Sequence, residues 1–286
     1  MALGRDDLVF SAGTHLVTPF LDRLAPAKAA GYAAVSVLPY EIEMLRASGV
    51  SDADIRARVA DHGLAIGELD AVTTWLPGHT PPSTFPAEMA ASLATSTAER
   101  LAPIGDAIGA RSLTVVEFYG ATPSVDTAAE AFASVCDVAA RHGLVAHLEF
   151  LPWTGIADLA TAWQIVQRAD RPNGGLLIDS WHLFRSGSTL DELRQIPGDR
   201  VLYVQIDDAP ATPEADLSDE TQHRRLLPGD GELDLVGLIR TLDAIGCTSP
   251  IGVEVFSDEL YAQPVDDVTR RSADAARKVI AAARAS

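Results

Sequence analysis

Short apolar runs recur eight times along the chain, and most of them end at a polar residue before a segment with helical periodicity. The runs occupy residues 8–13, 33–39, 64–72, 112–118, 145–150, 174–180, 201–207 and 251–256. Apolar runs of this length are typical of strands that are buried on both faces of a parallel sheet. We therefore predict eight parallel strands that carry polar groups at their carboxyl ends.

Helices are predicted between and after these strands. They span residues 20–30, 52–62, 87–108, 127–142, 156–168, 190–195, 233–245 and 265–285. Continuous alternation of strand and helix indicates an α/β protein with a parallel sheet, and eight units favour one closed (β/α)8 TIM barrel over residues 1–286. Two proline-containing stretches, residues 76–86 and 210–228, are predicted to be active-site loops, with plain surface loops as the alternative.

The charge and the termini narrow the choice of partners. The formal net charge is -18 and Lys28 and Lys278 are the only lysines, whereas nucleic-acid binding requires clustered cations. The first residues lack a signal-peptide pattern, and no apolar run approaches the roughly 18 residues of a membrane span. Cys136 and Cys247 lie far apart and are predicted to be reduced core thiols. We expect a cytoplasmic protein with a small-molecule substrate and no nucleic-acid or membrane partner. A homo-oligomer is compatible with the sequence.

Polar residues end four consecutive predicted strands. In a barrel the carboxyl ends of the strands converge on one face, so these residues become neighbours: Glu149, Asp179, Gln205 and Glu254. Each has apolar neighbours, where an unpaired carboxylate would be costly. An all-oxygen set of this kind suits one divalent ion, Mg²⁺ or Mn²⁺, and the nearby His182 also admits Zn²⁺ or Co²⁺. The alternative is that the acids pair with arginines at the strand ends.

The motifs around these positions resemble a known family, the xylose isomerase-like TIM-barrel proteins described as sugar phosphate isomerases and epimerases. The matching segments are Glu149 in His-Leu-Glu-Phe, Asp179 and His182 in Ile-Asp-Ser-Trp-His, Gln205 in Tyr-Val-Gln-Ile-Asp-Asp-Ala, Arg225 before Leu-Leu-Pro-Gly-Asp-Gly-Glu-Leu-Asp, and Glu254 in Gly-Val-Glu-Val. The resemblance covers essentially the whole chain and is sharpest between Glu149 and Glu254. It implies one divalent ion held by Glu149, Asp179, Gln205 and Glu254.

The resemblance leaves two reactions open. Many epimerases of this type have a histidine where this chain has Gln205, whereas the metal-dependent 3-dehydroshikimate dehydratases have a glutamine. Both reactions begin by removing a proton next to a carbonyl, with a cation holding the developing enolate. The leading prediction is an isomerase or epimerase of a small polyhydroxylated carbonyl compound, a sugar or cyclitol, and the alternative is a dehydratase of the 3-dehydroshikimate type.

The resemblance also suggests roles for individual residues. Glu149 and Glu254 would lie on opposite sides of the metal and act as acid and base. His182 would contact the substrate or protonate a departing oxygen, and the alternative is that it only fixes Asp179.

Four further residues are predicted to bind substrate. Arg225 would clamp a hydroxyl, carboxylate or phosphate, unless it is a surface arginine paired with Asp230. Trp153 and Trp181 would form apolar walls of the pocket, with ordinary packing as the alternative. The fourth is Glu68, one of several weaker candidates near strand ends, with Asp70, Glu117, Tyr119 and His15.

Other classes of function fit the sequence less well. A nuclease on the same barrel would need a metal cluster, many histidines and a cationic face, but the chain has seven histidines and a charge of -18. Schiff-base catalysis is disfavoured because both lysines fall in predicted helices. A non-catalytic small-molecule-binding protein remains an alternative.

Overall fold

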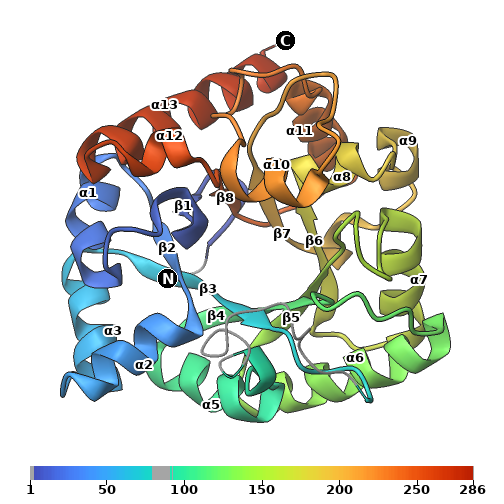
Figure 1. Cartoon of the computed structure of the whole chain (residues 1–286), viewed down its shortest axis with the longest axis horizontal. Helices are drawn as coiled ribbons and strands as arrows, with labels where there is room; N and C mark the ends of the chain where they lie inside the picture. The colour runs from blue at the N-terminus through green and yellow to red at the C-terminus, as the bar shows by residue number, and fades with distance from the viewer. Residues whose placement is uncertain (1–2, 79–90, 92, 286) are drawn as a thin grey trace.

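Each of the eight apolar runs forms a strand in the computed structural model, which describes residues 3–78, 91 and 93–285. The strands are β1 (Leu8–Phe10), β2 (Ala34–Val37), β3 (Ala65–Val72), β4 (Ala110–Val116), β5 (Val145–Glu149), β6 (Gly174–Asp179), β7 (Val201–Ile206) and β8 (Ile251–Val253). All neighbours pair in parallel, and β1 pairs with β8, so the sheet closes into a barrel (Figure 1). The predicted TIM barrel is confirmed.

Helices surround this ring of strands (Figure 1). They are α1 (Leu24–Ala29), α2 (Pro39–Ala47), α3 (Asp52–Asp61), α5 (Ala98–Ile108), α6 (Val125–Arg141), α7 (Leu159–Ala169), α8 (Ser180–Arg185), α9 (Leu190–Leu193), α10 (Leu217–His223), α11 (Leu235–Ala244), α12 (Asp258–Tyr261) and α13 (Val265–Arg284), with short 3-10 helices at Ala12–His15, Phe20–Arg23 and Gly198–Arg200. None of the helices within the described ranges is both long and apolar enough to cross a bilayer.

Several helices differ from the sequence prediction. Four described helices, α2, α8, α10 and α12, were not predicted, because most are too short to show an apolar period. The predicted helix at residues 20–30 is divided between a 3-10 turn and α1. The predicted helix at 87–108 and the loop at 76–86 lie partly outside the described residues.

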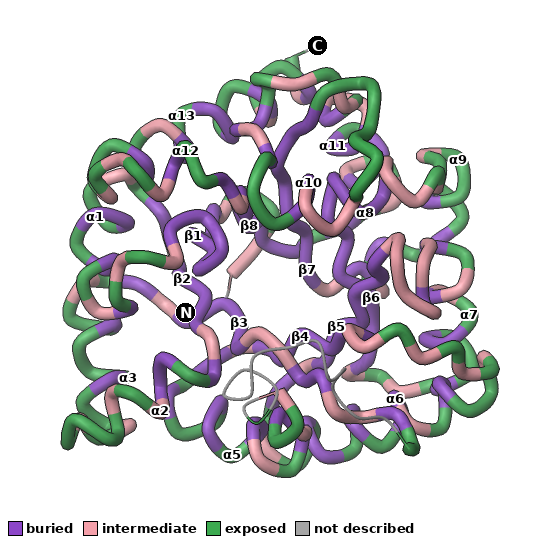
Figure 2. Tube along the Cα trace, in the orientation of Figure 1, coloured by how far each residue is buried: buried purple, intermediate pink, exposed green. Residues whose placement is uncertain are grey.

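Apolar side chains fill two layers. The larger core lies between the barrel and the helices, whose outer faces are exposed (Figure 2). A smaller cluster of Val9, Ala34, Leu177 and Tyr203 comes from β1, β2, β6 and β7, as expected for side chains that fill a barrel interior. Cys136 and Cys247 are buried and free, as predicted, and burial raises the pKa of the Cys136 thiol to about 12.

A buried ion pair outside the candidate site should contribute strongly to stability. The Arg23 guanidinium contacts the Glu41 carboxylate at 2.6 Å, and both side chains are almost fully buried. Replacing Arg23 with methionine would leave the Glu41 charge buried and unpaired. We expect the free energy of unfolding, measured in urea, to fall by about 3–5 kcal/mol.

An exposed pair in the same part of the chain provides the control. Arg46 contacts Asp52 at the same distance of 2.6 Å, but both side chains are partly exposed to solvent. Replacing Arg46 with methionine should change the free energy of unfolding by less than about 1 kcal/mol. Equal losses in the two variants would contradict the assigned importance of burial.

Candidate functional site

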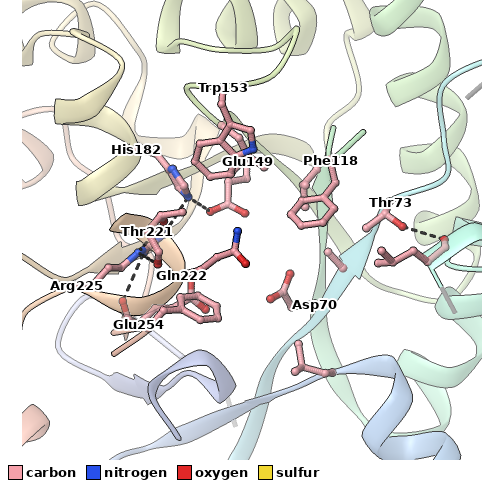
Figure 3. Close-up of a pocket in the computed structure, with 16 residues that line it drawn as sticks. Asp70, Thr73, Phe118, Glu149, Trp153, His182, Thr221, Gln222, Arg225 and Glu254 are labelled. Atoms are coloured by element: carbon pink, nitrogen blue, oxygen red, sulfur yellow. Dashed lines mark hydrogen bonds and ion pairs between the residues drawn. The ribbon is translucent and has the colours of Figure 1, made fainter. Parts of the chain in front are cut away.

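A cavity of about 290 Å³ opens at the carboxyl ends of the strands. Its described lining residues are Leu38, Asp70, Ala71, Thr73, Leu93, Val116, Phe118, Glu149, Leu151, Trp153, His182, Thr221, Gln222, Arg225, Glu254 and Phe256 (Figure 3). Eight of these sixteen described residues are apolar and eight are polar or charged, and such a combination of apolar walls with convergent polar groups is expected of a site for a small polar molecule.

Three carboxyl groups reach this cavity from different strands. Glu149 is the last residue of β5, Glu254 directly follows β8, and Asp70 lies near the end of β3. Figure 3 shows Asp70 across the cavity from His182 and Glu149. Sequence positions more than 180 residues apart are thus brought to one cavity by barrel closure.

Asp179 and Gln205 lie side by side on β6 and β7, where their backbones pair in register. Neither is among the residues that line the cavity. Asp179 is the last residue of β6 and also the N-cap of α8. Its Oδ1 accepts a hydrogen bond from the backbone N–H of His182 at 2.8 Å. Its carboxylate is therefore held rigidly at the base of the site.

Gln205 presents an unusual arrangement. Its Nε2 donates to Glu68 Oε1 at 3.4 Å, while its Oε1 is buried and has no hydrogen-bond partner among the described residues. Gly252 makes room for this side chain, since an added Cβ would lie 3.2 Å from the Gln205 Cγ. A buried carbonyl oxygen without a donor is costly, so Oε1 is a candidate ligand atom.

Arg225 is buried at the base of the site with all five of its N–H groups engaged. Nη1 donates to Asp179 at 2.8 Å and to Asp207 at 2.5 Å. Nε and Nη2 donate to the Thr221 hydroxyl at 3.0 and 2.7 Å, and Nη2 also faces His182 Nε2 at 3.2 Å. A guanidinium has five N–H donors, and these acceptors use them all.

This arrangement corrects one prediction about Arg225. Its partners are Asp179 and Asp207 rather than Asp230. Arg225 lines the cavity, but its N–H groups donate to acceptors within the protein. No N–H group of Arg225 is therefore free in this structure to form the predicted clamp on a substrate anion. Burial opposes the charge of Arg225, but Asp179 and Asp207 outweigh that effect and raise its pKa.

His182 lines the cavity with its ring Nε2 at 3.5 Å from Glu149 Oε1. Arginine can only donate, so the contact from Arg225 makes Nε2 an acceptor and puts the imidazole proton on Nδ1. Burial lowers the pKa of His182 to about 3, with Arg225 adding to the effect. His182 is therefore neutral at physiological pH, and its Nε2 has no proton to give to a departing oxygen.

The carboxyl groups of the site have raised pKa values because they are crowded in a buried space. Burial raises the pKa of Glu149 well above its ordinary value, with Asp179 adding to the rise, and burial followed by Asp70 does the same for Glu254. Burial alone raises the pKa of Asp70 to about 6. For Glu68 and Asp207 the pKa rises to about 8, again mainly through burial.

Two predicted substrate contacts do not reach the cavity. Trp153 lines it, but Trp181 is fully buried behind it, where its Nε1 donates to Glu220 at 3.0 Å and its ring meets Trp153 edge to face. Glu68 is fully buried below the cavity, held by the Thr114 hydroxyl at 2.9 Å. Trp181 and Glu68 therefore support neighbouring side chains and cannot touch a bound molecule in this structure.

The segment at residues 210–228 supplies groups that the sequence prediction did not name. It contains α10, whose Thr221 and Gln222 line the cavity beside Arg225, and the Gln222 amide projects into the space between Glu149 and Asp70 (Figure 3). No sequence motif marks these residues. The only available signal was the length of the segment after the seventh strand.

The donor groups present fit a divalent cation. Ligand atoms of Glu149, Asp179 and His182 lie within 4.8 Å of one another, and Gln205 adds its unpartnered oxygen. The described part of the site holds six carboxyl groups, of which Arg225 pairs with only Asp179 and Asp207: Glu68, Asp70, Glu149, Asp179, Asp207 and Glu254. A cation would offset the resulting excess of negative charge.

Comparison with known proteins gives both family and relatives. A family model described as "Xylose isomerase-like TIM barrel" matches residues 24–279. The chain is 32% identical over 143 residues to a 3-dehydroshikimate dehydratase of Pseudomonas putida, a match that covers 50% of this chain and 22% of that protein. It is 34% identical over 140 residues to an inosose isomerase of Bacillus subtilis, with 48% of each chain covered. Both relatives are enzymes by name, and the chain spans no more than about half of either.

A solved structure shows the same fold. The crystal structure of an IolI protein with a bound zinc atom superposes with a TM-score of 0.82 at 20% identity, covering 96% of this chain and 98% of that one. At this identity the likeness concerns the fold alone.

Proposed function

The chain belongs to the xylose isomerase-like TIM barrel family, and from that premise we propose that it is a divalent-metal-dependent isomerase or epimerase of a small cyclic polyhydroxylated ketone. The observation that carries the proposal is the pair of buried glutamates, Glu149 and Glu254, on the wall of one small cavity. Two carboxyl groups on one cavity wall, both with pKa values raised by burial, can act as the acid and the base toward a bound substrate.

The two glutamates divide the proton transfer. One takes the proton from the hydroxyl-bearing carbon beside the carbonyl, which leaves an enolate. Returning that proton to the former carbonyl carbon, while the hydroxyl proton passes to the former carbonyl oxygen, moves the ketone by one carbon. Returning it to the opposite face of the same carbon inverts the configuration instead. Neither outcome gains or loses atoms.

The metal site would be formed by Glu149, Asp179, Gln205 and Glu254, with His182 beside it. When bound, the cation would polarise the carbonyl oxygen and so make the neighbouring proton more acidic. The oxygen ligands suit Mg²⁺ or Mn²⁺, and an imidazole beside them is also compatible with Zn²⁺ or Co²⁺. Arg225 and the backbone of His182 hold Asp179 in place for this role.

The charge of the cavity favours an uncharged ketone such as an inosose. Arg225 is the one arginine or lysine among the described lining residues, and its N–H groups are already used. Residues 79–90 and 92 contain no lysine or arginine in the sequence. A substrate carboxylate would therefore find no free arginine or lysine side chain among the described lining residues to pair with it.

A dehydratase is the second candidate, and Gln205 is the observation that favours it. This residue type at the ligand position resembles the 3-dehydroshikimate dehydratases, and such a protein of Pseudomonas putida is a relative. In that reaction the proton is removed in the same way, but a hydroxyl on the next carbon leaves as water. The substrate, 3-dehydroshikimate, is a carboxylate, which the cavity charge disfavours.

Product analysis separates the two candidates. The purified chain, loaded with Mg²⁺ or Mn²⁺, would be given an inosose and 3-dehydroshikimate in separate reactions. We expect an isomeric ketone of unchanged mass from the inosose and no dehydrated product from 3-dehydroshikimate. Faster dehydration of 3-dehydroshikimate than isomerisation of the inosose would replace the first candidate with the second.

A further inference from the structure

Asp70 has a position in the cavity that the proposed proton transfer does not use. It projects from β3 into the cavity on the side opposite His182, with Gln222 between them (Figure 3). The residue is half-buried, and no hydrogen bond joins its carboxylate to another described residue. A carboxylate of this kind gains from a donor supplied by a bound molecule.

The arginine that lines the cavity cannot neutralise the Asp70 carboxylate. Arg225 directs its five N–H groups to Asp179, Asp207, Thr221 and His182. The other acidic groups at the cavity, Glu149 and Glu254, bring no positive charge to it. The side of the cavity at Asp70 therefore accepts hydrogen bonds and repels anions.

We propose that Asp70 is a specificity-determining residue, which accepts a hydrogen bond from a hydroxyl of a neutral polyhydroxylated ring and excludes rings that carry a carboxylate. The inference rests on the proposed function, since it assigns a substrate class to the same cavity. It concerns recognition alone, because the proposed proton transfer is assigned to Glu149 and Glu254.

Binding of two unreactive ring compounds tests the proposal without turnover. The probes are myo-inositol, which is neutral, and shikimate, which carries a carboxylate, each titrated calorimetrically into the full chain with saturating Mg²⁺. The wild-type protein should bind myo-inositol at least about tenfold more tightly than shikimate, because like charges in a partly buried site repel. Asp70→Asn keeps the shape of the side chain and removes its charge. The ratio of the Kd of shikimate to the Kd of myo-inositol should therefore fall by about tenfold or more.

Asp61→Asn is the control, because it removes one negative charge from the exposed end of α3, away from the cavity lining. Its ratio should equal that of the wild type. The proposal is overturned if Asp70→Asn leaves the ratio unchanged, if Asp61→Asn shifts it equally, or if the wild type binds neither probe or favours shikimate. Failure of the proposed function would appear instead as absent turnover of an inosose, whatever the binding ratio.

Discussion

Replacing Glu254 or Glu149 with glutamine should lower kcat by about 10²–10⁴-fold, because an amide can neither take nor return a proton at the substrate carbon. The two side chains line the cavity from different strands, so neither can take over the role of the other. Initial rates with an inosose at saturating Mg²⁺ measure the effect. Full activity in either variant would remove that glutamate from the mechanism.

A matched control separates lost chemistry from lost stability. Glu41→Gln also changes a buried glutamate to an amide, but Glu41 pairs with Arg23 outside the cavity lining. This variant should unfold at a lower temperature and keep its kcat below that temperature. If Glu41→Gln lost activity as severely as Glu254→Gln, the loss would reflect general damage to the fold.

Removal of the metal should abolish turnover, and added Mg²⁺ or Mn²⁺ should restore it. The carboxyl groups of the site have raised pKa values because they crowd together in a buried space, and a cation would relieve that repulsion. The protein should also lose thermal stability with EDTA, since a ligand present at 100 times its Kd stabilises the folded state by about 2.7 kcal/mol. Undiminished turnover after dialysis against EDTA would contradict the metal requirement.

Gln205→Leu should weaken Mn²⁺ binding in a titration of the free protein, because the variant lacks the unpartnered Oε1 assigned to the cation. We expect the Kd to rise by at least about tenfold, as for the loss of a buried charge-assisted contact. Gln164→Leu, at an exposed position on α7, serves as the control and should bind Mn²⁺ as the wild type does. An unchanged Kd in Gln205→Leu would exclude Gln205 as a ligand.

The barrel could be predicted from sequence because its signal is repeated along the chain. Each apolar run ends at a polar residue, and barrel geometry alone brings those ends together. Glu149 and Glu254 reach one cavity for this reason, and Asp179 and Gln205 lie on adjacent strands for the same reason. Their assignment to a metal remains a prediction.

The depth and partners of individual side chains could not be read in the same way. Glu68 and Asp70 lie two residues apart on β3, yet Asp70 reaches the cavity and Glu68 is buried below it. Trp181 follows Asp179 by two residues, but the immediate start of α8 turns its ring toward Glu220. Such differences depend on contacts between segments that are distant in the sequence, and the periodicity of a local segment does not indicate those contacts.

The interactions of Arg225 were missed for a related reason. Its partner Asp207 lies 18 residues away and follows β7, and the chain returns through α10 to bring the two together. The sequence suggested Asp230, the nearer acid, because separation along the chain was the only distance available. In the observed structure the N–H groups of Arg225 bind acceptors within the protein.

Proton exchange with solvent tests the central claim most directly. The metal-loaded protein would be incubated with an inosose in D₂O and followed by proton NMR. Abstraction of a proton next to the carbonyl predicts that the signal of that proton disappears as deuterium replaces it, while the ring keeps all its hydroxyl groups. Retention of the signal through many turnovers, or loss of water from the ring, would contradict the proposed isomerisation.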